Sequence, residues 1–369
     1  MKSILLITHD TSLTGAPKSV LLLFEELKKQ GYKITTVALR GGGQLEKRFR
    51  DISEKYYRID QFSKTVDYSV YNRIRRLFLG HMIQSDLKKC IDEIVTNSFD
   101  IIYANTIVSL KFASELKIRL KAKLILHVHE LETVIEEFCP DLFSYDKWVD
   151  SFIVPSYLNE KILVDRYFIS SNKISVIRET SDFQLSDYTK KKDDTKINVL
   201  MCGGAYWRKG DDLFLLIAKS ILKLDSNYNF FWVGKQSEER KRVNNADIHK
   251  MGLSDNVFFI DETLDPMSWY LNSDLFLLTS REDPFPLAAV EAGMLGLPIF
   301  CFEDATGISE VIHSSCVLPY LDIEAMANQI ITIYNNKSLL GSIEKQNKTT
   351  FQEFTPLKIA EQITFIFEQ

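Results

Sequence analysis

Two short apolar runs on either side of one helix-length segment constrain the fold of this chain most strongly. Residues 275–278 and 299–302 are apolar throughout, without the polar alternation of a strand that faces water on one side. Between them, Pro286 suits the first position of a helix, and Gly296 and Pro298 suit its end. The stretch therefore predicts a strand–helix–strand unit of a parallel sheet that is buried on both faces.

The same alternation recurs along the chain and predicts an α/β fold with two Rossmann-like, doubly wound domains. At 369 residues the chain is longer than one hydrophobic core normally supports. Residues 179–196 are polar and charged without apolar periodicity, which is typical of a linker. We expect a first domain over residues 1–178, a second over residues 197–345 facing it across a cleft, and a helical segment, residues 346–369, that packs back toward the first. Buried strands are expected at residues 4–7, 34–39, 101–104, 123–128, 152–154, 174–177, 197–202, 230–233, 257–260, 275–278 and 299–302.

The composition and the cysteine pattern limit the classes of protein to which the chain can belong. Hydrophobic residues make up 45% and charged residues 26% of the chain, as in ordinary soluble proteins. The five cysteines form no CxxC pair and no cluster with histidine at metal-ligand spacing, so we expect a cytoplasmic location and no bound metal. The start of the sequence lacks the apolar segment of a signal peptide, and no run approaches the roughly 18 apolar residues of a membrane span. The net charge of −5 and the absence of nucleic-acid motifs disfavour nucleic-acid binding.

Two carboxylates on the strand–helix–strand unit predict a ligand site. Asp283 lies at the turn between strand and helix, and Glu291 lies in the helix among apolar residues. A carboxylate is costly to bury without a partner, and the free N–H groups at a helix start favour anions and hydroxyls. Two structural alternatives stay open: Asp283 as a helix-entry cap, and Glu291 as the partner of a buried basic residue.

A glycine-bearing basic turn follows the first strand of the second domain. Gly203 and Gly204 allow a phosphate to approach the backbone closely, and Arg208 and Lys209 add positive charge before the next helix. The turn is typical of a phosphate site, although a helix start with basic residues facing solvent has the same pattern. Gly15 stands in the loop after the first strand of the chain, at the strand end that ligands of doubly wound sheets approach.

Together these motifs resemble those of the family 4 glycosyltransferases, which are retaining enzymes of the GT-B fold. Five motifs fall in the family's order: the Gly15 loop, His129-Glu130 after a strand, the Trp207–Gly210 turn, Asp283 and Glu291 with seven residues between them, and Gly307-x-x-Glu310. The resemblance covers nearly the whole chain. It implies transfer of a hexose from a UDP- or GDP-sugar to a glycan or lipid-linked acceptor, with retention of anomeric configuration, in bacterial surface polysaccharide synthesis.

The resemblance implies roles in donor binding for the residues of the second domain. Glu291 is expected to bind the ribose hydroxyls of the nucleotide, a task that suits a carboxylate with two acceptor oxygens. Asp283 is expected to face the donor sugar. Backbone groups of three residues that follow it are expected to assist: Phe285, Pro286 and Leu287.

The diphosphate leaving group is expected to contact Lys209, with Arg208 nearby, because preorganised positive charge acts most strongly there. Many family members carry an arginine where this chain has Gly203 or Gly204, and Arg208 is the candidate substitute. Gly15 is expected against the diphosphate from the first domain. The resemblance also implies that the leaving phosphate oxygen takes the acceptor's proton, so that neither a protein base nor a divalent metal is needed.

On the acceptor side, the resemblance places His129 at the reaction centre, while the alternation of neighbours predicts that His127 faces the core. Asn105 and Thr106, at the end of another strand, are acceptor-site candidates. Glu310 stays open between a site residue and a solvent-facing helix residue.

The segment Tyr71–Lys89 mixes basic and apolar residues. This composition favours either a packed helix with a basic edge or a helix that lies on an anionic membrane. Two other functions also stay open: a nucleotide-sugar epimerase of the GT-B fold, and a non-catalytic, glycosyltransferase-like ligand-binding subunit.

Overall fold

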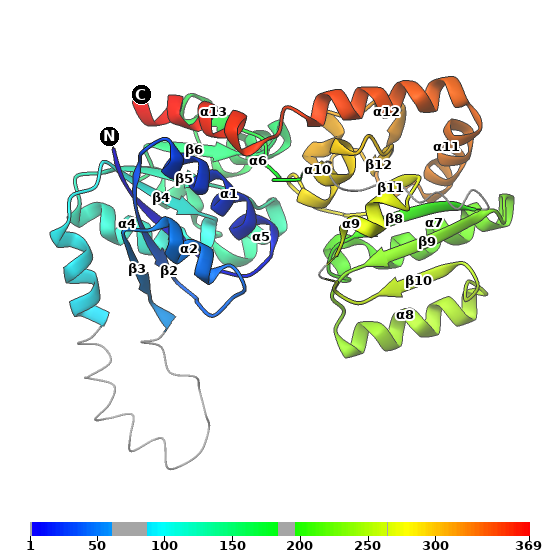
Figure 1. The fold of residues 1–369 in the computed structure, drawn as a ribbon, viewed down its shortest axis with the longest axis horizontal. Helices are drawn as coiled ribbons and strands as arrows, with labels where there is room; N and C mark the ends of the chain where they lie inside the picture. Colours follow the sequence, from blue (N-terminus) through cyan, green and yellow to red (C-terminus); the bar gives the residue numbers. More distant parts are fainter. Residues whose placement is uncertain (1, 61–86, 184–195, 264) are drawn as a thin grey trace, which may run out of the picture. The chain divides into compact units, whose positions relative to one another are not determined.

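The computed structural model describes residues 2–60, 87–183, 196–263 and 265–369. Within them the chain forms two compact units, each built on one parallel sheet (Figure 1). The first unit comprises Met1–Pro155, Glu160–Ile177 and Pro356–Gln369, and the second comprises Ser156–Asn159 and Arg178–Thr355. Two Rossmann-like α/β domains, the predicted fold class, are therefore confirmed.

The first unit contains a seven-stranded sheet in the order β3-β2-β1-β4-β5-β6-β7. Its strands are β1 (Ser3–Thr8), β2 (Lys33–Ala38), β3 (Lys55–Arg58), β4 (Ile101–Asn105), β5 (Lys123–His127), β6 (Ser151–Val154) and β7 (Ile174–Val176). Its helices are α1 (Gly15–Lys29), α2 (Glu46–Ile52), α4 (Leu110–Arg119), α5 (Glu132–Phe138), α13 (Pro356–Glu368) and, from Glu160 on, α6 (Tyr157–Tyr167). Every residue of β4 is buried, as expected for a central strand with both faces covered.

The second unit contains a six-stranded sheet in the order β10-β9-β8-β11-β12-β13. Its strands are β8 (Ile197–Cys202), β9 (Tyr228–Val233), β10 (Val257–Ile260), β11 (Leu275–Leu278), β12 (Ile299–Phe302) and β13 (Val317–Leu318). Its helices are α7 (Asp211–Leu224), α8 (Glu238–Met251), α9 (Met267–Leu271), α10 (Leu287–Met294), α11 (Ile323–Asn335) and α12 (Lys337–Phe351). The strand order reverses between β8 and β11, and ligands of doubly wound sheets bind at the carboxyl ends of such a pair.

The predicted strand–helix–strand unit is present as β11, α10 and β12. Helix α10 begins at Leu287, one residue later than expected, because Pro286 has an extended backbone and occupies the N-cap position. The edge strands β3 and β13 and residues 337–345 of helix α12 lie outside the predicted elements.

The predicted linker, residues 179–196, begins with packed chain. Glu179, Thr180 and Ser181 are each at most 5% exposed and belong to the second unit. Thr180 Oγ1 donates to the carbonyl oxygen of Phe354 at 2.9 Å. These first three residues therefore contribute to the interior of the second unit.

The C-terminal helix α13 packs beside α1 in the first unit (Figure 1). The sequence-based boundary at residue 346 falls inside α12, and the return to the first unit occurs at Pro356. Lys2 Nζ and Lys123 Nζ donate to the carbonyl oxygens of Phe367 and Ile366. Positive charge at a helix C-terminus is favourable, so these lysines fix the end of α13 on the first unit.

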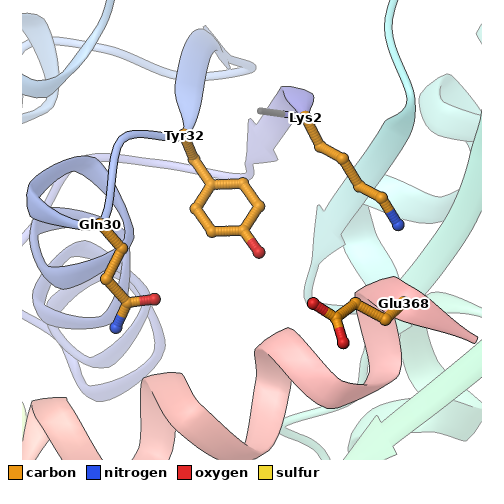
Figure 2. Close-up of a pocket in the computed structure, with 4 residues that line it drawn as sticks. All are labelled: Lys2, Gln30, Tyr32 and Glu368. Carbon is orange, nitrogen blue, oxygen red and sulfur yellow. The ribbon is translucent and has the colours of Figure 1, made fainter.

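A pocket of 260 Å³ lies next to this contact, lined by Lys2, Gln30, Tyr32 and Glu368 (Figure 2). Lys2 and Tyr32 directly precede β1 and β2, so the pocket lies at the amino ends of these strands. None of the predicted site residues lines it. The pocket is therefore at the opposite edge of the sheet from the end that ligands of this fold approach.

The segment Tyr71–Lys89 lies almost entirely outside the described residues, which resume at residue 87. Among the helices that the structure describes, none combines the length and the apolar character needed to cross a bilayer.

Gly210 is the position where a side chain would most directly disturb the second unit. Its φ is 73°, and a Cβ there would lie 2.1 Å from the carbonyl oxygen of Thr279. Gly252 is a matched control, because its φ is 72° but a Cβ would have nothing within 4 Å.

We expect Gly210→Ala to lower the midpoint of thermal unfolding clearly more than Gly252→Ala. The left-handed backbone alone costs an alanine about 1–2 kcal/mol at either position, and only Gly210→Ala adds a clash between backbone atoms. Circular dichroism melts of both variants measure the difference. Equal midpoints would show that the turn after β8 accommodates the added methyl group without loss of stability.

Candidate active site

The two halves of the predicted donor site meet at the carboxyl ends of β8 and β11. The short 3₁₀ helix η5 (Trp207–Lys209) follows β8, and Asp283 lies in the loop after β11. Lys209 Nζ forms an ion pair with Asp283 Oδ2, and Arg208 Nη1 lies 3.8 Å from Asp283 Oδ1. Two motifs that are 74 residues apart in sequence thus form one charged cluster.

Asp283 is buried and held from several sides. Its side chain accepts a hydrogen bond from Ser280 Oγ at 3.1 Å, and its backbone N donates to the carbonyl oxygen of Ala305 at 2.8 Å. Pro286 is the N-cap residue of α10, and no described side chain caps this helix. The alternative of Asp283 as a helix-entry cap is therefore wrong, and its carboxylate contacts the basic turn instead.

The basic turn directs two cations at this one carboxylate. Arg208 also donates to the carbonyl oxygen of Glu282 at 2.6 Å and to Tyr206 Oη at 2.9 Å. Burial opposes the charge of Arg208, but the neighbouring Asp283 and Tyr206 outweigh burial and raise its pKa. Arg208 is therefore held charged, and both basic side chains are partly buried at a position where an anionic ligand can replace Asp283 as their partner.

Gly203 and Gly204 lie where two loops of the second sheet approach each other. Gly203 O accepts a hydrogen bond from Trp232 Nε1 at 2.8 Å, and a Cβ on Gly234 would lie 2.1 Å from the same oxygen. Gly203 itself has a φ of 151°. The missing side chain of Gly234 and the backbone conformation of Gly203 therefore permit the two loops to pack closely beside the basic turn.

Glu291 lies on α10, 8% exposed, and receives two hydroxyl groups. Tyr270 Oη donates to Oε2 at 3.0 Å, and Ser181 Oγ donates to Oε1 at 3.2 Å. Burial, together with Cys202 and Glu291, raises the pKa of the Tyr270 hydroxyl, so it stays protonated and donates. Each carboxylate oxygen can accept more than one hydrogen bond, so Glu291 can bind ligand hydroxyls while Tyr270 and Ser181 orient it.

The three residues expected to assist Asp283 have different positions. Phe285 is 3% exposed, and its ring packs edge-on against Phe354 at 5.6 Å between centroids. Pro286 has no N–H group, so Leu287, the first residue of α10, supplies the first backbone donor of that helix.

In the first unit, the predicted acceptor-side residues lie at the carboxyl ends of β4 and β5. Asn105 Nδ2 donates to the carbonyl oxygen of Ala16 at 3.3 Å, which orients the amide so that Oδ1 faces His129 Nε2 at 2.7 Å. Gly15, the first residue of α1, has open space where a Cβ would be. His129, Asn105 and the start of α1 are therefore joined at the carboxyl edge of the sheet.

Thr106 has a φ of 76°, which is rare for a β-branched residue. Its hydroxyl is buried and has no hydrogen-bond partner among the described residues. Strained backbone and unsatisfied buried polar groups are concentrated at functional positions.

The two histidines of β5 and its loop differ as expected. His127 is 4% exposed, with Nδ1 2.8 Å from Tyr103 Oη, whereas His129 is only half-buried. His9, at the end of β1, was not predicted as a site residue because no motif marks it. Burial lowers its pKa, against the opposing charge of Asp10.

Glu310 anchors the start of α6 within the second unit. Its carboxylate accepts hydrogen bonds from the backbone N of Tyr157 and Leu158 at 3.1 and 2.9 Å and pairs with Arg178 at 2.7 Å. A Cβ on Gly307 would lie 2.2 Å from Ser156 Cβ. The Gly307-x-x-Glu310 motif therefore packs against the start of α6 and caps it.

Two family models match the chain and together cover most of it. The model described as Glycosyltransferase Family 4 matches residues 13–180, and the model described as Glycosyl transferases group 1 matches residues 186–350. The chain therefore belongs to the glycosyltransferases of the GT-B type. The resemblance to family 4 that the motifs carry is confirmed.

Individual relatives are distant. An uncharacterized glycosyltransferase of Haemophilus influenzae is 25% identical over 206 residues, which are 55% of this chain and 57% of the relative. The lipopolysaccharide core biosynthesis mannosyltransferase LpsB of Rhizobium meliloti is 24% identical over 148 residues, 37% of this chain and 40% of the relative. The matched region thus spans little more than half of the first relative and less than half of the second.

The fold itself is similar over the full length to a solved structure. Anabaena HepE, crystallised in complex with UDP and glucose, matches with a TM-score of 0.80 and 16% identity over 100% of both chains. At this identity the likeness concerns the fold alone.

Proposed function

We propose that this protein transfers a hexose from a nucleoside-diphosphate sugar to a glycan or lipid-linked acceptor, with retention of anomeric configuration. The observation that carries the proposal is the convergence of Lys209 and Arg208 on Asp283, on the same unit as the hydroxyl-bonded Glu291. A cationic centre and a buried carboxylate acceptor suit the two polar parts of such a donor, its diphosphate and its ribose.

The donor roles follow from these contacts. Glu291 would accept the ribose hydroxyls, oriented by Tyr270 and Ser181. Lys209 and Arg208 would bind the diphosphate, which takes the place of the Asp283 carboxylate as their partner. Asp283, released from Lys209, would then face the donor sugar, close to the first backbone N–H groups of α10.

The proposed reaction is a single exchange at the anomeric carbon. The acceptor's hydroxyl oxygen forms a bond to this carbon on the face that the leaving group departs from, and the bond from the carbon to the β-phosphate oxygen breaks. The electron pair stays on that phosphate oxygen, which takes the hydroxyl proton. Lys209 and Arg208 stabilise the charge that develops on the diphosphate, so we propose that no protein base and no divalent metal is needed.

For the acceptor we propose the polar residues of the first unit. His129, Asn105 and the strained Thr106 present an imidazole, an amide and a hydroxyl at the carboxyl edge of the sheet, where saccharide hydroxyls can be bound. The likeness to LpsB, a lipopolysaccharide core biosynthesis mannosyltransferase, supports a hexose donor and a role in assembling a bacterial surface polysaccharide. For a lipid-linked acceptor, we propose that the protein is cytoplasmic and that the segment Tyr71–Lys89 binds the membrane surface. Sedimentation of the protein with anionic but not with neutral vesicles would support this contact.

Binding of nucleotide sugars to the full chain tests the proposal most directly. We expect UDP or GDP, and one of their hexose conjugates, to raise the midpoint of thermal unfolding, because a ligand of the native state at 100 times its Kd adds about 2.7 kcal/mol of stability. EDTA should leave the shift unchanged. If no nucleoside diphosphate or its sugar conjugate stabilises the protein at millimolar concentration, the proposal fails.

The stereochemistry of the product tests the reaction itself. With the donor that binds, we expect nucleoside diphosphate release to depend on added saccharide, and NMR of the product to show the donor's anomeric configuration. Release that needs no acceptor and yields an epimeric sugar would identify an epimerase instead. Binding without any turnover would identify a ligand-binding subunit.

A further inference from the structure

All three carbonyl groups of the basic turn Trp207–Lys209 are bound from one short segment after β11, residues 279–281. The contacts are Arg281 Nη1 to Trp207 O at 2.8 Å, Arg281 N to Arg208 O at 2.8 Å, and Thr279 Oγ1 to Lys209 O at 3.0 Å. The backbone of the turn is therefore fixed by the strand next to its own.

The side chain of Arg281 connects the turn to the helix that follows it, α7. Its guanidinium forms a bidentate pair with Asp212, at 2.9 and 2.8 Å, and lies 5.2 Å from the centre of the Trp207 ring. It is 11% exposed, and Asp212 lies in the first turn of α7, where the free N–H groups favour a carboxylate. One planar guanidinium thus joins the start of η5 to the start of α7, a geometry that lysine cannot reproduce.

We propose that Arg281 is a positioning residue that holds Lys209 and Arg208 for the diphosphate of the donor. This inference rests on the proposed function, because it concerns the same site. Arg281 hydrogen-bonds to the carbonyl groups of the turn and to Asp212, so its effect is exerted through the backbone of the turn. Charge that is already in place when the ligand arrives binds phosphate more tightly than charge that must be ordered on binding.

The structure offers a matched control in a second ion pair at the start of the same helix, α7. Arg240 forms a bidentate pair with Asp211, at 2.7 and 2.6 Å, one residue before Asp212. Asp211 is fully buried, so Arg240→Met is expected to reduce stability at least as much as Arg281→Met. The two variants remove the same kind of ion pair, but only Arg281 also contacts the turn.

Calorimetry with the full chain separates positioning from stability. The probes are UDP and UMP, or GDP and GMP if the guanine nucleotides bind better. We expect Arg281→Met to weaken diphosphate binding about tenfold, a loss of about 1.4 kcal/mol, and monophosphate binding less than twofold. Arg281→Lys should be intermediate. Arg240→Met should lower the unfolding midpoint but leave the ratio of the two affinities as in the wild type.

Two results would overturn the inference: an unchanged affinity ratio in Arg281→Met, or an equal change of the ratio in Arg240→Met. Either result would leave the proposed function standing if the wild type binds the diphosphate. A wild type that binds neither UDP nor GDP would instead remove the proposed function itself.

Discussion

Lys209→Met should lower the rate of sugar transfer by about 10²–10³-fold while the second unit keeps its fold. This is the usual loss when one preorganised charge that faces a developing anion is removed. The fold should persist because Asp283 keeps its contacts with Ser280 and Arg208, so the buried carboxylate is not left without partners. Steady-state kinetics with the donor from the binding screen measure the loss, which should appear mainly in kcat.

Lys241→Met is the matched control for this prediction. Lys241 lies on α8 and pairs with Asp261 at 2.9 Å and with Glu238 at 3.4 Å, away from the cluster at η5. Its replacement removes an ion-paired lysine of the same unit and should leave turnover unchanged. Near-normal kcat in Lys209→Met, with unfolding midpoints alike in both variants, would remove Lys209 from the proposed site.

Glu291→Gln should weaken binding of the nucleotide by about 10–100-fold, because hydrogen bonds to a charged group contribute about 1.5–3 kcal/mol. The amide has nearly the same shape, but its NH₂ group would face one of the two hydroxyl donors, Tyr270 or Ser181, that now point at the carboxylate. The variant should also accept fewer ligand hydrogen bonds. Tyr270→Phe, which removes only an orienting group, should have a smaller effect of the same kind.

Nucleotides without ribose hydroxyls make this prediction specific. The 2′,3′-dideoxy form of the bound nucleotide should bind Glu291→Gln and the wild type with similar affinity, because the proposed contact is missing in both. Glu324→Gln, in the exposed first turn of α11, controls for the change of charge. A loss in Glu291→Gln that is equally large for the dideoxy nucleotide would show that Glu291 supports the fold and does not bind ribose.

The parts of the fold that the sequence predicted are those with a local signal. The central strands β8, β11 and β12 were placed correctly because they are apolar at nearly every position. The edge strand β3 was missed because Lys55–Arg58 is polar and only partly buried, as an edge strand can be. Residues 337–345 of helix α12 were missed because they contribute few residues to the buried face, Leu340 and Ile343.

The candidate site shows the same division. Asp283, Glu291 and Lys209 were recognisable because their spacing within short motifs resembles that of a family. Ser181 was missed because it lies in a stretch with the composition of a linker, and Tyr270 because it reads as one more residue of a short helix. Neither carries a local pattern that points to a carboxylate.

Gly293 is a residue whose role only the tertiary structure explains. It belongs to the Ala-Gly pair that follows Glu291, and a Cβ there would lie 2.3 Å from the ring of Phe351. The glycine is therefore required by the contact between α10 and α12.

The sequence by itself determined that this chain forms two parallel-sheet units and that its second half carries a phosphate-suited turn and two unusual carboxylates. These features are local, because a strand buried on both faces must be apolar and a basic turn must carry its own charges. Only the tertiary structure decided that Lys209 pairs with Asp283, that hydroxyls orient Glu291 and that Arg281 fixes the basic turn. Those partners are distant in sequence and meet only when the sheet brings β8 and β11 side by side.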